Sequence, residues 1–295
     1  MKTLMPVIKW PGSKRPIATQ LHALWPSSRT PESTYFEPFI GSGAMLPGRP
    51  CVRAVAGDVI GPLIDLWNAI VDRPDDVADH YTSIWDKRQA TGHTVFYDVR
   101  DRFNEHYDPL DLMVLSRMCV NGLIRFNKSG EFNNSLHHTR PGIKPETLRS
   151  LLHAWARALG NVDFLESDFE DTLAPAKKGD FVFLDPPYLG TRGRYKPIAF
   201  DFDRLWRVVE ELNEKGVFWI MTLDGKAGSR EYNSNAVPES LFANKFLINT
   251  GNSPFTRLMN TSIDSVREAV YLNFDPPGQR MLGLPENRPQ PEQSV

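Results

Sequence analysis

The sequence is poor in cysteine, in long apolar runs and in net charge. Its 295 residues include two cysteines, Cys51 and Cys119, which lie far apart, so no disulfide framework and no cysteine metal site is expected. No apolar run approaches the length of a membrane span, and the N-terminus lacks the apolar core of a signal peptide. We therefore expect a cytoplasmic protein that does not associate with membranes. The net charge of −2 excludes a chain that is basic throughout.

What the sequence does contain is an alternation of strand and helix patterns towards both ends. Short β-branched and aromatic runs predict strands at 34–40, 52–56, 162–165, 181–184 and 217–223, with a final antiparallel pair at 246–250 and 269–273. Apolar residues at helical spacing predict helices at 17–25, 62–71 and 201–215. Such alternation favours a parallel sheet with helices on both faces.

Between the two alternating parts, strand signals nearly vanish. Helical patterns follow one another at 77–88, 95–105, 109–119 and 144–159, and a polar loop spans 121–142. We therefore predict an α/β domain formed by 1–74 and 161–275, with a helical insertion at 75–160. Residues 276–295 are rich in Pro, Gln, Glu and Arg and are predicted to be a disordered tail.

The sequence Asp185-Pro186-Pro187-Tyr188 directly follows the apolar run 181–184. Two prolines end the predicted strand and leave an acid, a free carbonyl and an aromatic ring at its carboxyl end. In open α/β sheets ligands bind at that edge. The alternative is a structural proline turn in which Tyr188 packs as a lid.

Three other predicted strands end in residues suited to a nucleoside. Phe39-Ile40-Gly41-Ser42-Gly43 is a glycine turn that lets a ligand approach the backbone closely. Asp58 could accept hydrogen bonds from ribose hydroxyls, and Asp168 and Phe169 could contact an adenine ring. Helix capping is the alternative for each of the two acids. Because the turn carries no phosphate-binding lysine, a nucleoside with a carboxylate fits better, which points to S-adenosylmethionine.

Six short motifs then occur in an order that resembles the Dam-type family of DNA adenine-N6 methyltransferases. They are Lys9-Trp10-Pro11-Gly12-Ser13-Lys14, Glu37-Pro38-Phe39-Ile40-Gly41-Ser42-Gly43-Ala44, Gly57-Asp58, Arg125-Phe126-Asn127 with Gly130-Glu131-Phe132-Asn133, Asp168-Phe169, and Asp185-Pro186-Pro187-Tyr188. The resemblance covers residue 9 to about residue 274. It implies a mixed seven-stranded methyltransferase sheet with helices on both faces and a helical DNA-recognition insertion.

The resemblance also implies roles for individual residues. The residues matched to S-adenosylmethionine binding are Trp10, Lys14, Phe39, Gly41, Gly43, Asp58, Asp168, Phe169 and Asp185. The residues matched to catalysis are Asp185, Pro186 and Tyr188. Asp185 and the Pro186 carbonyl would accept the two hydrogens of the adenine amino group while Tyr188 stacks on the extruded base.

A basic segment in the insertion predicts contact with double-stranded DNA. Residues 117–149 carry six cations and two anions, a +4 island in a chain of charge −2. The predicted DNA-binding residues are Arg125, Phe126, Asn127, Lys128, Asn133 and Arg140, together with Arg192 and Arg194 after the proline motif. Phe126 matches an aromatic position that wedges into the base stack in relatives. A solvated surface loop is the alternative for the charge count.

Several expectations complete this interpretation. We expect no metal, because the adjacent His137 and His138 lack supporting ligands, and no obligate protein partner. Residues 134–140 depart from the pattern of the GATC-specific members. Within enzymes, methylation of cytosine N4 or of RNA adenine is the alternative; outside them, it is a DNA-binding protein that has lost catalysis.

Overall fold

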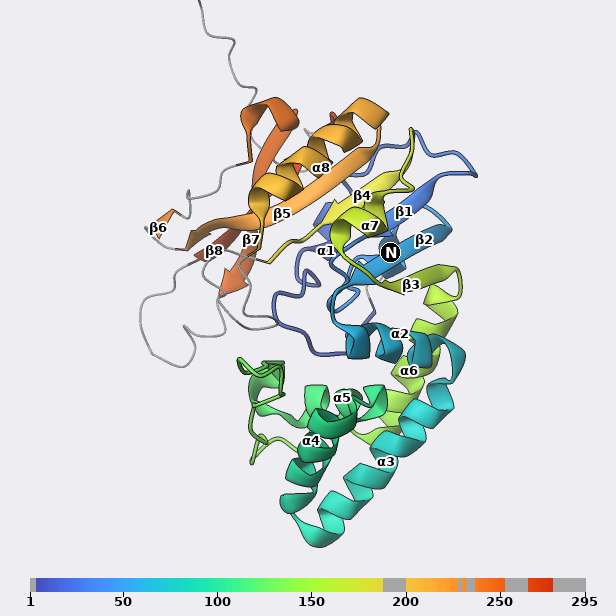
Figure 1. Ribbon diagram of the computed structural model, residues 1–295, viewed down its shortest axis with the longest axis vertical. Helices are drawn as coiled ribbons and strands as arrows, with labels where there is room; N and C mark the ends of the chain where they lie inside the picture. Colours follow the sequence, from blue (N-terminus) through green and yellow to red (C-terminus); the bar gives the residue numbers. More distant parts are fainter. Residues whose placement is uncertain (1–3, 188–199, 228–229, 232–236, 253–264, 278–295) are drawn as a thin grey trace, which may run out of the picture.

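The computed structural model describes residues 4–187, 200–227, 230–231, 237–252 and 265–277, and its centre is one mixed sheet (Figure 1). The strands are β1 (Thr34–Glu37), β2 (Arg53–Asp58), β3 (Val162–Glu166), β4 (Phe181–Leu184), β5 (Phe218–Ala227), β6 (Arg230–Glu231), β7 (Asn244–Asn252) and β8 (Ser265–Leu272). Their order is β3-β2-β1-β4-β5-β8-β7, and the short β6 pairs with β5 beside this path. The five strands β3, β2, β1, β4 and β5 run parallel to one another, whereas β8 is antiparallel to both β5 and β7. The predicted mixed seven-stranded sheet and its final antiparallel pair are confirmed.

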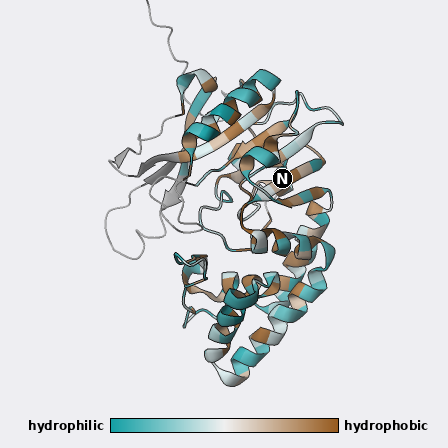
Figure 2. Ribbon diagram, viewed as in Figure 1, coloured by the Kyte–Doolittle hydropathy of each residue, from teal (hydrophilic) through white to brown (hydrophobic). Residues whose placement is uncertain are grey.

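Helices cover both faces of the sheet, because successive side chains of a strand point to opposite sides. Phe181 and Phe183 of β4 join one buried cluster, which also contains α1 (Ala18–His22) and α2 (Gly61–Asp72). Val182 and Leu184 join the other, against α7 (Phe169–Leu173) and α8 (Phe202–Lys215). Figure 2 shows hydrophobic residues gathered in the middle of the sheet and mainly hydrophilic residues along α8.

The helical segment between α2 and β3 forms the lower part of the molecule in Figure 1. Its helices are α3 (Pro74–Thr91), α4 (Thr94–His106), α5 (Pro109–Met118) and α6 (Pro145–Leu159), with the short 3-10 helix η2 (Val120–Gly122) after α5. The helix α6 packs on both α2 and α3, so it joins this segment to the sheet. A second 3-10 helix, η3 (Glu239–Leu241), precedes β7.

One element near the glycine turn differs from the sequence prediction. The strand expected at 34–40 ends at Glu37, because Pro38 has no N–H with which to continue the ladder. After Gly43 the chain forms only the short 3-10 turn η1 (Leu46–Gly48), because Pro47 disfavours a longer helix. The chain between them is therefore irregular.

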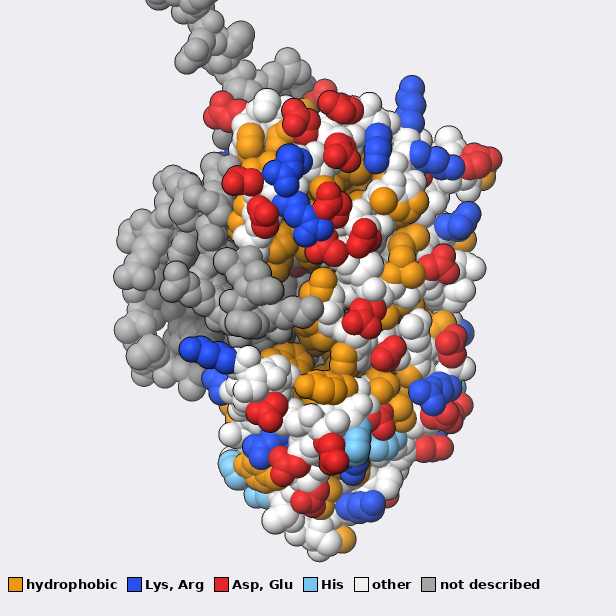
Figure 3. Space-filling view, viewed as in Figure 1, with side chains coloured by type: hydrophobic (Ala, Val, Ile, Leu, Met, Phe, Trp, Pro, Cys, Tyr) orange, Lys and Arg blue, Asp and Glu red, His pale blue; other side chains and the backbone are white. Residues whose placement is uncertain are grey.

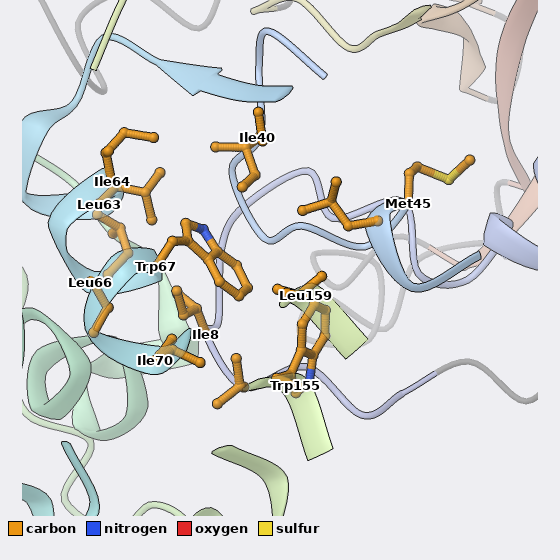
Figure 4. Packing of buried hydrophobic residues seen from close by; sticks show 14 of the residues in the cluster. Ile8, Ile40, Met45, Leu63, Ile64, Leu66, Trp67, Ile70, Trp155 and Leu159 are labelled. Atoms are coloured by element: carbon orange, nitrogen blue, oxygen red, sulfur yellow. The ribbon is translucent and has the colours of Figure 1, made fainter. Parts of the chain in front are cut away.

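Trp67 of α2 packs against the irregular turn and stabilises it. Trp67 is fully buried, stacks on Phe164 at 6.0 Å between ring centroids, and lies 5.3 Å from Trp155 of α6. Its indole N–H donates a 3.2 Å hydrogen bond to the Gly41 carbonyl oxygen. Figure 4 shows Trp67 between α2, the turn and α6, surrounded by aliphatic side chains. The same ring thus supports the hydrophobic core and the glycine turn.

We predict that Trp67→Ala lowers the free energy of unfolding by about 3–5 kcal/mol, because it leaves a large cavity in a packed core. Trp67→Phe keeps a ring but loses the bond to Gly41, and we expect a smaller loss of about 1–2 kcal/mol. Urea denaturation measures both. The control is Val52→Ala, at a side chain that is 71% exposed, which should stay within about 0.5 kcal/mol of the parent. A Trp67→Ala variant as stable as this control would contradict the prediction.

Candidate active site

The carboxyl ends of four parallel strands bring most of the predicted site residues to one edge of the sheet. Asp168 follows β3, Asp58 ends β2, the glycine turn follows β1 and Asp185 follows β4. Because the strand order is β3-β2-β1-β4, these groups lie in a row in that order. In the sequence they are separated by up to 144 residues (41 to 185), so only the sheet order reveals the row.

The glycine turn is built against the N-terminal motif. Gly41 and Gly43 have φ values of 44° and 61°, a region that favours glycine. A side chain at Gly41 would also come within 2.8 Å of the Trp10 ring. The Gly41 N–H points at Asp58 Oδ2 at 3.4 Å, and the Ile60 N–H donates to Asp58 Oδ1 at 3.2 Å. Trp10, the turn and Asp58 therefore form one connected group.

Asp168 and Phe169 are tied to the neighbouring helices. Asp168 caps α7 by accepting a 3.0 Å hydrogen bond from the Glu170 N–H, so the capping interpretation of Asp168 describes its contact here. Arg204 of α8 pairs with the Asp168 carboxylate and with Glu170, and its guanidinium lies 4.7 Å from the centre of the Phe169 ring. Phe169 is 4% exposed and also packs on Phe39, 5.6 Å between centroids. Arg204 is a partner that no sequence motif indicated.

Lys14 approaches Asp185. Its ammonium nitrogen lies 2.9 Å from Asp185 Oδ1 and 3.5 Å from Glu268 Oε1, and donates to the Gly12 carbonyl oxygen at 2.9 Å. Lys14 is only 3% exposed. Burial alone would lower its pKa, but the Asp185 and Glu268 carboxylates outweigh burial, so the pKa of Lys14 is raised. Lys14 is therefore a charged group inside the site.

A second donor holds the same oxygen of Asp185. The Thr222 hydroxyl on β5 donates to Asp185 Oδ1 at 3.0 Å. Two donors on one oxygen fix the orientation of a carboxylate more firmly than one donor does. Thr222 and Glu268 were not among the predicted residues, because β5 and β8 carry no motif around them. Their side chains can be assigned to the site only once the strand pairing is known.

A third carboxyl group lies buried behind the site. Glu37, at the end of β1, is 3% exposed and accepts a 3.0 Å hydrogen bond from the Tyr35 hydroxyl. Burial is the main cause that raises the pKa of Glu37 to about 8; the Tyr35 hydrogen bond opposes this and the Asp185 charge adds to it. Glu37 is therefore neutral at pH 7 while its neighbours carry charge.

The predicted DNA-binding motif forms a compact loop next to α4 and α5. The Asn133 N–H bonds to the Arg125 carbonyl and the Asn127 N–H to the Glu131 carbonyl. The Asn127 side chain closes the tip by accepting from the Ser129 and Glu131 N–H groups. Asn133 Oδ1 accepts from Arg125 Nε at 2.8 Å. Both asparagines thus use side-chain groups to build the loop.

Phe126, predicted to insert into the base stack, lies in a buried aromatic cluster in this structure. Its ring is 7% exposed and packs against Phe103 and Phe132, with centroids 6.4 and 6.2 Å away. An aromatic side chain in such a cluster stabilises the loop and cannot enter a base stack without leaving it. In this structure Phe126 anchors the loop to α4, and its role as a wedge stays a prediction.

The basic island is smaller than the sequence count indicated. Arg117 is 7% exposed and donates to the Pro6 carbonyl, and Arg149 pairs with Asp75 and Asp79. Of the six cations counted, four are exposed and make neither of these contacts: Arg125, Lys128, Arg140 and Lys144. Figure 3 shows basic side chains on the insertion at its edge beside the grey residues. Within this described island, the cations available to phosphates thus lie on the loop and just before α6.

Part of the predicted site lies outside the described residues. Tyr188, Arg192 and Arg194 belong to this part, so their roles stay predictions, as does most of the predicted tail. Among the residues that the structure describes, no helix has both the length and the apolarity needed to cross a membrane.

An open sheet with a glycine turn and acids at its carboxyl edge is typical of α/β enzymes that bind nucleoside ligands. Comparison with known proteins identifies the family. A family model described as the D12 class of N6 adenine-specific DNA methyltransferases matches residues 10–240. A DNA adenine methylase of Serratia marcescens is 31% identical over 193 residues, covering 64% of this chain and 68% of the relative. The Type II methyltransferase M1.LlaDCHI of Lactococcus lactis subsp. cremoris is 27% identical over 238 residues, covering 74% and 81%.

The chain therefore belongs to the D12 class of N6 adenine-specific DNA methyltransferases. It is an enzyme that methylates adenine in DNA, as the resemblance of its motifs predicted. The alternatives of cytosine or RNA methylation and of a non-catalytic DNA-binding protein are thereby set aside.

The raised pKa of Glu37 predicts a specific dependence of stability on pH. In the folded protein the pKa of Glu37 is about 8, so Glu37 keeps its proton up to about that pH, whereas the pKa of an unperturbed Glu is 4.5. Between these values the folded state binds more protons, so its stability falls as pH rises. Glu37→Gln, which cannot ionise, should therefore gain about 1–3 kcal/mol relative to the parent between pH 6 and pH 8, at about 1.4 kcal/mol per pKa unit.

Urea denaturation of parent and variant at pH 6 and pH 8 measures this difference. The comparison uses the change in the difference between the two proteins, so any pH-independent effect of the substitution cancels. An equal difference at the two pH values would show that Glu37 is already ionised at pH 6.

Proposed function

We propose that this enzyme transfers the methyl group of S-adenosylmethionine to N6 of an adenine extruded from duplex DNA, with Asp185 as the central catalytic residue. The observation that carries the proposal is the place of Asp185. It lies one strand beyond the row of nucleoside-type groups and its carboxylate is held by Lys14 and Thr222.

The order of the strand ends supports the cofactor assignment. Asp168 and Phe169 stand at β3, Asp58 at β2, the glycine turn at β1 and Asp185 at β4. Adjacent strands are about 4.8 Å apart, so the row matches an extended ligand with a nucleobase, a ribose and an amino-acid tail in that order. The sulfonium joins the ribose to the amino-acid tail, and its methyl group would have to face Asp185 for transfer. Trp10 would line the pocket beside Gly41, which its ring already contacts.

The reaction requires orientation and electrostatic stabilisation. The adenine amino nitrogen is a weak nucleophile, because its lone pair is delocalised into the ring. Asp185 and the Pro186 carbonyl would accept its two hydrogens and place it in line with the methyl group. The N–CH3 bond would form as the S–CH3 bond breaks and S-adenosylhomocysteine leaves. Positive charge would thereby pass from sulfur to nitrogen, where the Asp185 carboxylate stabilises it until the methylated amino group releases one proton to water. Tyr188 would stack on the extruded base.

The insertion supplies the proposed DNA contact. Arg125, Lys128 and Arg140 are exposed on or near the loop and would neutralise backbone phosphates. Arg192 and Arg194 follow the proline motif and would contact the backbone near the extruded base. Extrusion of a paired base costs a few kcal/mol, which these contacts would offset. The loop's internal bonds from Asn127 and Asn133 keep its tip in one shape for this contact.

We predict that Asp185→Asn reduces methyl transfer at least about 100-fold, because it removes the charge from a preorganised group at the reacting nitrogen. Duplex DNA incubated with tritiated cofactor reports the rate, and isolation of N6-methyladenine from that DNA locates the product. Cofactor binding and thermal unfolding of the variant serve as controls. Transfer at the parent rate by a folded Asp185→Asn variant would remove the proposed role.

We predict that Lys128→Ala and Arg140→Ala each weaken DNA binding to all sequences alike and reduce the salt dependence. The slope of log K against log salt should fall by about 0.9 for each phosphate that the variant no longer neutralises. The matched control is Arg149→Ala, because Arg149 is already paired with Asp75 and Asp79. Fluorescence anisotropy at several salt concentrations measures the slopes. Equal slopes for all three variants and the parent would contradict the assigned surface.

A further inference from the structure

Glu268 is a half-buried carboxylate that no motif of the sequence singles out. It lies on β8, is 15% exposed, and its Oε1 is 3.5 Å from the Lys14 ammonium. In the chain it follows Asp185 by 83 residues and belongs to a strand that the predicted site did not include. Its place in the fold nevertheless brings it to the group that holds Asp185.

Sheet geometry explains why Glu268 reaches the site. On β5 and β8, Thr222 pairs with Val270 and Asp224 with Glu268. Val270 faces the core cluster that contains Phe181, Phe183 and α1, and Glu268 is two residues away on the same face. Asp185 and Glu37 continue that face at the ends of β4 and β1 by the same rule. Three carboxyl groups and Thr222 thus border the side of the sheet from which Lys14 enters.

Among the described residues, Lys14 lies between three acceptors. They are the Gly12 carbonyl, Asp185 Oδ1 and Glu268 Oε1, at 2.9, 2.9 and 3.5 Å from its nitrogen. An ammonium group has three N–H bonds on a flexible four-carbon chain. Because these acceptors belong to separate segments of the chain, together they restrict where the ammonium charge can sit, and Glu268 supplies the second carboxylate.

The charges show what a second carboxylate contributes. Asp185 and Lys14 alone would form a neutral pair, which attracts a developing positive charge weakly. Glu268 adds a second negative charge beside the ammonium, so Lys14, Asp185 and Glu268 together carry a formal charge of −1. In a partly buried site such a charge acts strongly on the sulfonium and on the methylated nitrogen.

We propose that Glu268 is a positioning residue for methyl transfer, which acts through Lys14 to keep Asp185 oriented and negatively charged towards the target amino group. This inference rests on the proposed catalytic role of Asp185. Lys14 then has two functions: it fixes the Asp185 carboxylate and shares its charge with a second acid. Glu268 itself contacts neither the base nor the cofactor in this proposal.

The test compares Glu268→Gln and Glu268→Asp with the parent and with Glu239→Gln, an exposed control outside the sheet. We expect Glu268→Gln to lower kcat about 10- to 100-fold, as loss of an orienting outer partner does in metal sites, with KM for DNA and cofactor and the melting temperature near the parent values. We also expect the alkaline limb of the kcat–pH profile to move to lower pH, because only one carboxylate then opposes the burial of Lys14. Glu268→Asp, which keeps the charge, should retain most of kcat and the parent limb.

Several outcomes would overturn the inference. One is parent kcat in Glu268→Gln. Another is a loss of kcat that only follows a loss of folded protein. A third is a loss of kcat without a shift of the alkaline limb. A purely structural role of Glu268 would produce either of these last two results. If Glu268→Gln does not fold, Glu268→Asp decides the question. A kcat and an alkaline limb near the parent values support the inference, and a lower kcat together with a shifted limb overturns it. Asp185→Asn, measured in parallel, separates this inference from the proposed function, because transfer at the parent rate in that variant removes the role of Asp185 itself.

Discussion

The ion pair between Lys14 and Asp185 is the interaction on which the site depends. It joins the N-terminal loop to the end of β4, two segments that are 171 positions apart in the sequence (14 to 185). A buried ammonium is costly unless it is paired, and here two carboxylates and a backbone carbonyl surround it. The pair therefore orients the Asp185 carboxylate, the proposed catalytic group, and also fixes the N-terminal motif against the sheet.

The glycine-turn side of the candidate site depends on packing rather than on charge. The turn after β1 is irregular because Pro38 ends the strand and Gly41 and Gly43 adopt positive φ. Trp67 stabilises this irregular backbone. Its indole N–H donates a hydrogen bond to the Gly41 carbonyl oxygen, and its ring packs against Trp155 of α6. Because α6 also packs on α3, the insertion and the glycine turn share one core.

The insertion uses many of its polar groups internally. Asp111 is fully buried and holds His80 and Arg102, while Asn127 and Asn133 shape the loop. Phe126 and Phe132 attach that loop to Phe103 of α4. A rigid loop with a few exposed cations loses little conformational entropy on meeting a duplex. Charge counts along the sequence therefore overstate the basic surface.

The sequence by itself determined the fold class, the family and most residues of the candidate site, because these follow from local patterns: apolar runs, glycine turns and an acid followed by prolines. It placed Asp58, Asp168 and Asp185 at strand ends correctly. Only the tertiary structure decided that Lys14 meets Asp185, that Thr222 and Glu268 join them, and that Phe126 is buried. These contacts depend on strand order and on which face of a strand points inward. Pairing between distant segments leaves no signal in local spacing, since it is set by packing of the whole sheet.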